Sequence, residues 1–212
     1  MNNIPLIKRL SGISVFLICF CSLSYADHNE VLKEKLWQQL YKDGGTSFYC
    51  KKPFKSKTPL LSESYIYSSS WITDHLRCGT KRQCNKSSPQ YHRIMSDLHN
   101  IVVADAYLEF KRKSSLFGEL DDSAPILKCN IRKGMNDIEP PDEIKGDIAR
   151  TIIYMHQQYK LPIMMSYSLL MLWHQADAPS PEELARNKRI AEIQGNENPF
   201  ITNPNLIHTI EH

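Results

Sequence analysis

The sequence predicts an α+β protein whose C-terminal half is helical. One observation is that Glu63–Thr73, ESYIYSSSWIT, is rich in the aromatic and β-branched residues that favour strands. The other is that Lys145–Tyr159 repeats apolar residues at helical spacing and is followed by two more segments of helical character. A chain of 212 residues is long enough for one domain with a sizeable core.

Residues 1–26 are expected to be a secretory signal peptide that precedes the domain. Lys8 and Arg9 give a positively charged start, and the apolar run ISVFLICFCSL is too short to span a bilayer. SYA, at residues 24–26, places small residues at the cleavage position. We therefore expect an exported monomer, periplasmic or extracellular, that does not lie in a membrane. The folded domain is expected at residues 27–200, with a flexible tail at 201–212.

The overall charge does not by itself indicate a nucleic-acid-binding protein. Loss of Lys8 and Arg9 with the signal peptide leaves 24 of the 26 basic residues against 23 acidic residues, so the net charge falls from +3 to +1. Binding to a polyanion would need a local cluster of basic residues. The candidate clusters are KKPFKSK at Lys51–Lys57, for which we favour a plain solvated loop, and KRK at residues 111–113, which is either a phosphate contact or a solvated charged turn.

Four cysteines follow the predicted signal peptide, at positions 50, 78, 84 and 129. In an oxidising compartment this even number predicts two disulfides, and four cysteines allow three pairings. We favour Cys78–Cys84, which would close a short loop, together with Cys50–Cys129, which would join distant segments.

The elements of the first half are predicted from their residue patterns. Asp27–Asp43 is expected to be a helix because Val31, Leu36 and Leu40 share one face. The other predictions are a loop at Lys51–Leu61, a strand at Glu63–Thr73, a polar loop at Cys78–Ser88, a helical start within Tyr91–Val103, and irregular chain at Gly118–Pro141 with some strand near Ile126–Ile131.

Three helices are predicted in the second half, at Lys145–Tyr159, Ser166–Gln175 and Pro181–Gln194. The third has a clear start, because Ser180 suits the N-cap and Pro181 the first helical position. Its end is also marked, since Gly195 tolerates the left-handed conformation that follows a last helical turn.

Four segments, in this order and spacing, resemble the bacterial endonuclease I family. They are SDLHN (Ser96–Asn100), RKSSLFGEL (Arg112–Leu120), KGDIARTIIYM (Lys145–Met155) and LWHQADAPSPEELARNKRIAEIQGNENPF (Leu172–Phe200). The resemblance covers residues 46–200, and its C-terminal block is the most specific part. QGNENPF looks like the closing signature of the family, which we interpret as a packed structural turn near the nucleic-acid face.

The resemblance implies an exported endonuclease that cuts DNA and often RNA with little sequence preference. It also implies a ββα-metal core, similar to the His-Me finger nucleases, in which one Mg²⁺ polarises the scissile phosphate. In such a site a Glu and an Asn hold the metal, a His next to the Glu deprotonates the attacking water, and an Arg steadies the phosphate.

This sequence departs from the family pattern at the site. With Trp71 as the anchor, the Glu falls on Tyr65 and the His on Ile66, and neither side chain binds Mg²⁺ or accepts a proton at neutral pH. Nine residues after SDLHN, the Asn falls on Glu109, and the Arg falls on Arg112. The resemblance therefore keeps Arg112 as the catalytic arginine and leaves Glu109 as a metal ligand of another type.

Two hypotheses follow for the chemistry. In the first, the protein is an active Mg²⁺-dependent nuclease with a rearranged site, in which Asp74 joins Glu109 as a metal ligand and His75 is the general base. A wet acidic pocket at Glu109 that faces His75 would favour this hypothesis.

In the second hypothesis, the protein is an inactive family member without a cofactor. It would bind nucleic acid weakly through Lys111, Arg112, Lys113 and the Lys51–Lys57 loop, or act as an interaction protein in the envelope or outside the cell. An apolar plug formed by Tyr65 and Ile66 in the old metal pocket would favour it. For His99 and Asn100 two interpretations stay open under both hypotheses. They either support the site or are structural residues of the core.

Overall fold

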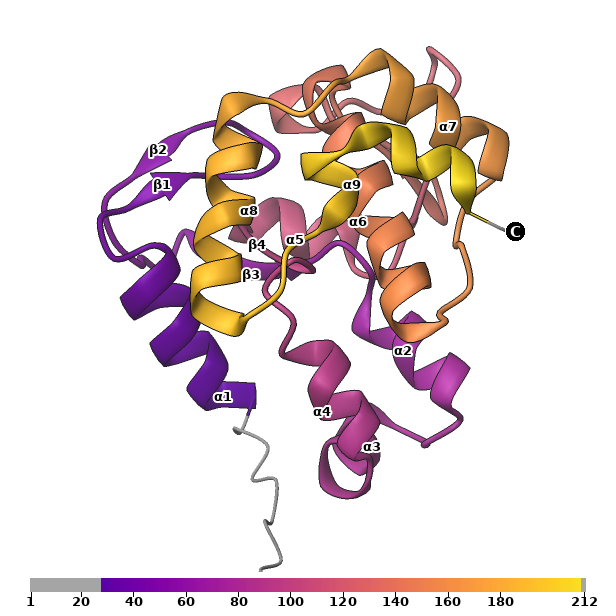
Figure 1. The fold of residues 1–212 in the computed structure, drawn as a ribbon. Helices are drawn as coiled ribbons and strands as arrows, with labels where there is room; N and C mark the ends of the chain where they lie inside the picture. Colours follow the sequence, from indigo (N-terminus) through magenta and orange to yellow (C-terminus); the bar gives the residue numbers. More distant parts are fainter. Residues whose placement is uncertain (1–27, 211–212) are drawn as a thin grey trace, which may run out of the picture.

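The computed structural model describes residues 28–210, so the predicted signal peptide at 1–26 lies outside the described residues (Figure 1). The helices are α1 (His28–Glu30), η1 (Val31–Leu40), α2 (Ser69–Leu76), α3 (Lys81–Ser87), α4 (Pro89–Met95), α5 (Ala106–Arg112), η2 (Lys128–Asn130), η3 (Asp142–Ile144), α6 (Lys145–Tyr159), α7 (Tyr167–Ala176), α8 (Pro181–Gln194), α9 (Pro199–Thr202) and η4 (Pro204–Thr209). The strands are β1 (Gly45–Thr46), β2 (Pro53–Phe54), β3 (Leu61–Tyr65), β4 (Ile101–Asp105), β5 (Leu116–Phe117), β6 (Arg132–Lys133) and β7 (Asp137–Glu139). The mixture confirms the α+β class and the helical C-terminal half.

The centre of the molecule is the unit β3–β4–α5. β3 and β4 pair antiparallel from Leu61↔Asp105 to Tyr65↔Ile101, and α5 packs against both strands. Asp105 ends β4 and caps α5, because its Oδ1 accepts the backbone N–H groups of Tyr107 and Leu108 at 3.0 and 3.2 Å. The connection between the two strands carries α2, α3 and α4, which lie below the strands in Figure 1.

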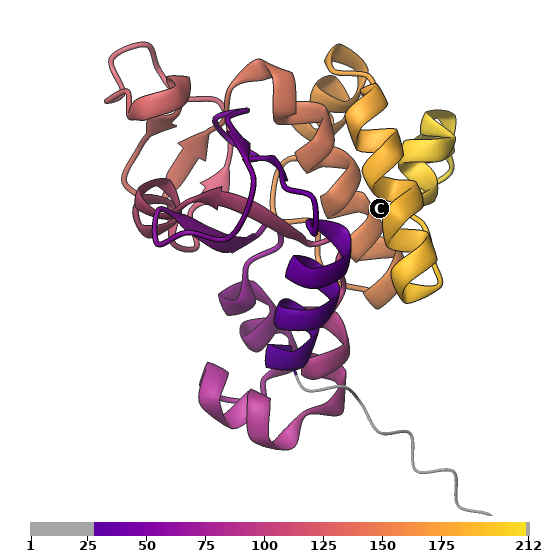
Figure 2. The same ribbon diagram turned by 90° about the vertical axis from the view of Figure 1, so that its left-hand side faces the viewer.

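The C-terminal helices supply a large share of the core, and α6 contributes most to it. α6 buries most of its residues and packs against α7 and α9, and Figure 2 shows these orange to yellow helices gathered on one side of the molecule. Ser180 caps α8 by accepting the N–H of Glu183 at 3.1 Å, and Gly195 ends it at φ 90°, as the sequence predicts. Among residues 28–210, no helix is both long enough and apolar enough to cross a membrane.

The predicted strand at Glu63–Thr73 is wrong beyond Tyr65. Ser68 accepts the N–H of Ser70 at 3.2 Å and starts α2, so Trp71 and Ile72 enter the core from a helix and not from a strand. The Ser-Ser-Ser run, which breaks the strand pattern, is the signal for this helix start.

The predicted polar loop at Cys78–Ser88 is also wrong, because it contains α3. A capping box forms there: the Thr80 hydroxyl accepts the N–H of Gln83, and the Gln83 side chain accepts the N–H of Thr80. The segment Tyr91–Val103 begins as a helix, as expected, and ends in β4. In the irregular segment 118–141, Ile126 makes an isolated bridge with Arg132, and the paired strands are β6 and β7.

The tail after Phe200 differs from the expected flexible segment. Its described residues, up to Ile210, form the end of α9 and all of η4, and Ile207 is completely buried. Apolar side chains at positions 201, 207 and 210 pack into the molecule, which gives this short segment a reason to be ordered. The two favoured disulfides, Cys50–Cys129 and Cys78–Cys84, are both formed.

Candidate functional site

A polar cavity of about 250 Å³ opens where the end of β3 meets α5. Its walls come from the last residue of β3, the first turn of α2, the first residue of α3 and the C-terminal end of α5. They are Tyr65, Ser68, Ser69, Ser70, Lys81, Glu109, Arg112, Lys113 and Ser114. Among these described residues Glu109 is the one acid, so the cavity is lined mainly by hydroxyl groups and cations.

Glu109 points toward the interior more than toward solvent. Its side chain is 23% exposed, its Oε2 accepts the Ser64 hydroxyl at 2.5 Å, and the same oxygen lies 3.7 Å from Nη1 of Arg112. The carboxylate is therefore held by partners from β3 and from its own helix.

Arg112 is buried, although it lies between two exposed lysines. Its guanidinium donates from Nη1 to the carbonyl oxygen of Tyr65 and from Nη2 to that of Ile66, both at 2.7 Å, and lies 4.8 Å from the ring centre of Phe117. The side chain thus fastens the end of β3 to α5 while it lines the back of the cavity. The three residues of KRK therefore differ, because Arg112 is buried whereas Lys111 and Lys113 face solvent.

Tyr65 and Ile66, to which the resemblance assigns the positions of an acid and a histidine, have different environments. Ile66 is completely buried in the core, while Tyr65 lines the cavity and its hydroxyl lies 2.7 Å from Nε2 of His28. Burial raises the pKa of Tyr65 well above its usual value, so its phenol stays protonated at neutral pH. The pocket is therefore neither the acidic pocket nor the apolar plug that the two hypotheses predict.

Asp74 and His75 lie on the exposed side of α2, outside the cavity that contains Glu109. The structure brings together Glu109, Arg112 and Lys113 of the predicted site, whereas Lys111 lies on the outer face of α5. Within residues 28–210 there is no group of three His, Cys, Asp or Glu side chains that could hold a metal ion.

Mg²⁺ does not fit the donor set of this cavity. The ion demands octahedral coordination by oxygen, usually from one or two carboxylates, several waters and substrate. The one carboxylate among the described lining residues is already bonded to Ser64 and faces the Arg112 guanidinium, whose positive charge would repel a cation.

The SDLHN segment builds the frame behind the site. Asn100 is completely buried and forms two hydrogen bonds with Tyr67, accepting its N–H at 2.6 Å and donating to its carbonyl oxygen at 3.0 Å. These bonds fix the chain just after β3. His99 is also buried and packs its ring against Tyr154; burial lowers its pKa, so it is a neutral structural histidine.

Asp97 is the centre of a buried hydrogen-bond network. Its carboxylate accepts the hydroxyl groups of Tyr154 and Tyr159 at 2.6 and 2.7 Å, the side-chain amide of Gln194 at 2.9 Å and the N–H of His99 at 2.9 Å. The network joins three segments that are far apart in the sequence. It therefore couples the strand β4 to the C-terminal helices.

The amides of QGNENPF complete this network and explain the unusual helix end. Gln194 accepts the N–H of Leu98 at 2.9 Å, and Asn196 donates to the Tyr154 hydroxyl at 2.6 Å. Asn198 is completely buried and caps α9 by accepting the N–H of Phe200 at 3.0 Å. The segment is a packed structural turn, as the sequence suggests.

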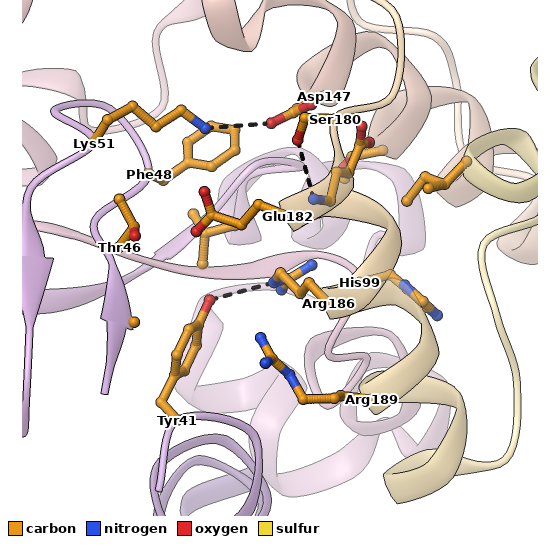
Figure 3. Close-up of a pocket in the computed structure, with 15 residues that line it drawn as sticks. Tyr41, Thr46, Phe48, Lys51, His99, Asp147, Ser180, Glu182, Arg186 and Arg189 are labelled. Atoms are coloured by element: carbon orange, nitrogen blue, oxygen red, sulfur yellow. Dashed lines mark hydrogen bonds and ion pairs between the residues drawn. The ribbon is translucent and has the colours of Figure 1, made fainter. Parts of the chain in front are cut away.

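A second, smaller cavity of about 60 Å³ lies between β1, η1, α6 and α8 (Figure 3). Two of its cations have partners inside the protein: Lys51 lies 3.6 Å from Asp147, and Arg186 donates to the carbonyl oxygens of Leu98 and Ile101 at 2.8 and 2.6 Å. In the candidate basic cluster Lys51–Lys57, the first lysine is thus paired with a residue of α6.

Sequence reasoning missed five residues of the main cavity, namely Ser68, Ser69, Ser70, Lys81 and Ser114. The serine run and the Thr80–Gln83 capping pattern mark the starts of α2 and α3 in the sequence, but it is the tertiary structure that brings these starts to one cavity.

Comparison with known proteins identifies close sequence relatives. The Endonuclease I family model matches residues 28–205. The chain is similar to Endonuclease-1 of Buchnera aphidicola subsp. Acyrthosiphon pisum, with 30% identity over 127 residues, 58% of this chain and 50% of the relative. It is also similar to an extracellular deoxyribonuclease of Aeromonas hydrophila, with 31% identity over 140 residues, 62% of this chain and 60% of the relative. An extracellular ribonuclease of Bacillus amyloliquefaciens is 30% identical over 128 residues, 51% of this chain and 44% of the relative. The matches thus span between 44% and 60% of these relatives' lengths.

Proposed function

Because the chain belongs to the endonuclease I family, we propose that it binds the phosphodiester backbone of DNA or RNA at the cavity between α2 and α5, without the one-metal cutting mechanism. The cavity lies at the end of the β3–β4–α5 unit, where the ββα arrangement of the family would place its chemistry. The relatives named above act on DNA or RNA, and this chemistry supports the choice of ligand.

The observation that carries the proposal is the make-up of the cavity. Lys81 and Lys113 are exposed cations at its rim, and three serine hydroxyls and the first turn of α2 form one wall. Hydroxyl groups, ammonium groups and a helix N-terminus all suit a phosphate oxygen. The carboxylate of Glu109 repels a bound phosphate, and this repulsion is smallest while Ser64 and Arg112 hold the carboxylate inward.

The donor set of the cavity supports the part of the proposal that excludes catalysis. The resemblance places the general base at position 66. Ile66 has an apolar side chain in the core and cannot accept a proton near neutral pH. Glu109 lacks a second carboxylate among the described lining residues, and we derive no step through Mg²⁺. The alternative, a rearranged nuclease that uses Asp74 and His75, would need α2 to turn its exposed face toward Glu109.

We further propose that the protein is exported. Relatives in Aeromonas hydrophila are named extracellular and periplasmic deoxyribonucleases, and the two disulfides suit an oxidising compartment.

The double substitution Lys81→Ala/Lys113→Ala should weaken binding of a short DNA duplex. Each lysine that neutralises a phosphate releases condensed counterions, so the slope of log K against log salt should fall by about 0.9 per lysine lost. Fluorescence anisotropy with a labelled duplex at several salt concentrations measures both the affinity and the slope.

The matched control is Lys33→Ala/Lys188→Ala, which removes the same charge from exposed positions on η1 and α8. Equal weakening by the two double variants would mean that only net charge matters, and the cavity would then not be the binding site.

A further inference from the structure

A line of exposed aromatic and basic side chains follows the outer face of α5. Tyr107 is 47% exposed and Phe110 is 66% exposed, and both project from the helix face opposite the buried Leu108 and Arg112. Side chains three residues apart on a helix are neighbours, so the two rings form one surface. Nothing in the packing of the domain requires large apolar groups at these positions.

Each ring is flanked by lysines. The ammonium groups of Lys111 and Lys128 lie 5.5 and 5.1 Å from the ring centre of Tyr107, and that of Lys113 lies 5.8 Å from the ring centre of Phe110. A cation at these distances lies over the ring face, so a stacking base would displace the ammonium group while the positive charge stays beside the ring. The acidic neighbours are Asp105, which pairs with Lys128 at 2.6 Å, and the inward-facing Glu109.

The line of side chains on α5 reaches the polar cavity between α2 and α5 at one end and a groove at the other. Lys113 lines the cavity, and Lys128 lines a groove of about 570 Å³ that also contains Lys52, Lys55 and Leu60. Tyr107 and Phe110 lie between these two lysines. The order of the side chains is therefore Lys128 beside the start of α5, the rings of Tyr107 and Phe110 on its outer face, and Lys113 at its end.

We infer that this α5 track, formed by Tyr107, Phe110, Lys111, Lys113 and Lys128, binds single-stranded nucleic acid by stacking bases on the two rings. The inference rests on the proposed function and extends it to a substrate class. A positive path with interleaved aromatic rings is what a single strand needs, because its backbone follows the cations and its unpaired bases offer their faces. In a duplex the faces are covered by neighbouring base pairs, so the rings would contribute little.

The groove end of the track is cationic as well. Phe54 also lines this groove, but its ring packs against Trp37 and Tyr41, so we assign it no stacking role. The strand would therefore leave the two rings over Lys128 and pass between Lys52 and Lys55 along its phosphates.

The test compares a 15-nucleotide oligothymidine with a duplex of the same length, using fluorescence anisotropy and the oxidised full-length protein. Tyr107→Ala/Phe110→Ala should weaken oligothymidine binding by about tenfold or more, since stacking contributes strongly for each base, and should change duplex binding by less than about threefold. Tyr107→Phe/Phe110→Tyr keeps both rings and should retain the affinity for oligothymidine.

Met135→Ala/Leu172→Ala is the matched control, because these apolar side chains are 93% and 57% exposed and lie outside α5, between β6 and β7 and on α7. Equal oligothymidine affinity for the alanine ring variant and this control would overturn the track. The track would also be overturned if sedimentation showed a dimer that the ring variant dissociates, because a second copy would then cover this face.

The failure of the track and that of the proposed function are distinguishable. If Lys81→Ala/Lys113→Ala weakens both nucleic acids while the ring variant weakens neither, the cavity binds phosphate and the track does not exist. If the unmodified protein binds neither nucleic acid, both proposals fail.

Discussion

Arg112→Met is expected to lower the free energy of unfolding by about 3–5 kcal/mol, the usual cost of removing one partner of a buried ion pair. Arg112 is 1% exposed and donates to two backbone carbonyl groups at the end of β3. Without it, these carbonyl groups and the carboxylate of Glu109 lose their charged partner in a water-poor environment. Urea unfolding followed by circular dichroism measures the loss.

Two further variants make this prediction specific. Glu109→Gln in the Arg112→Met background should recover part of the stability, because it removes the uncompensated charge. Arg93→Met, at an exposed position of α4, should change stability by less than about 0.5 kcal/mol. If Arg112→Met kept full stability and lost only nucleic-acid binding, Arg112 would be a phosphate ligand and not a structural residue.

Asp97→Ala is expected to cost a similar amount, about 3–5 kcal/mol, for a different reason. The carboxylate accepts four hydrogen bonds, from Tyr154, Tyr159, Gln194 and the backbone of His99. Its removal leaves these buried donors without an acceptor and separates the C-terminal turn from β4. Thermal and urea unfolding should both shift.

Asp122→Ala is the matched control, since the Asp122 side chain is 99% exposed, and its effect should lie within about 0.5 kcal/mol. An Asp97→Ala protein as stable as this control would show that water replaces the carboxylate in the network, and the turn would not depend on Asp97.

The helical half could be predicted well because its signals are local. Ser180, Pro181 and Gly195 mark the two ends of α8, and the structure uses all three as the sequence predicts. The disulfides were predictable because one pairing closes a short loop and the other joins what remains.

The site was less predictable because its geometry depends on contacts between distant segments. The KRK segment does not reveal that its arginine turns inward while its lysines face out, since that follows from how α5 packs on β3. Likewise, the aromatic run before Trp71 favours a strand until Ser68 caps a helix. Local propensity was overridden there by a side-chain cap.

The central claim is that the cavity binds the phosphodiester backbone without metal-dependent cutting, and a plasmid-nicking assay at neutral pH tests it most directly. The oxidised protein is incubated with supercoiled DNA in Mg²⁺, in Mn²⁺ and in EDTA, beside Glu109→Ala and His75→Ala, while anisotropy confirms that DNA is bound. We expect binding with no nicking in any of the three conditions. Nicking that requires the metal and is lost in Glu109→Ala would contradict this account and show that the protein is a nuclease with a rearranged site.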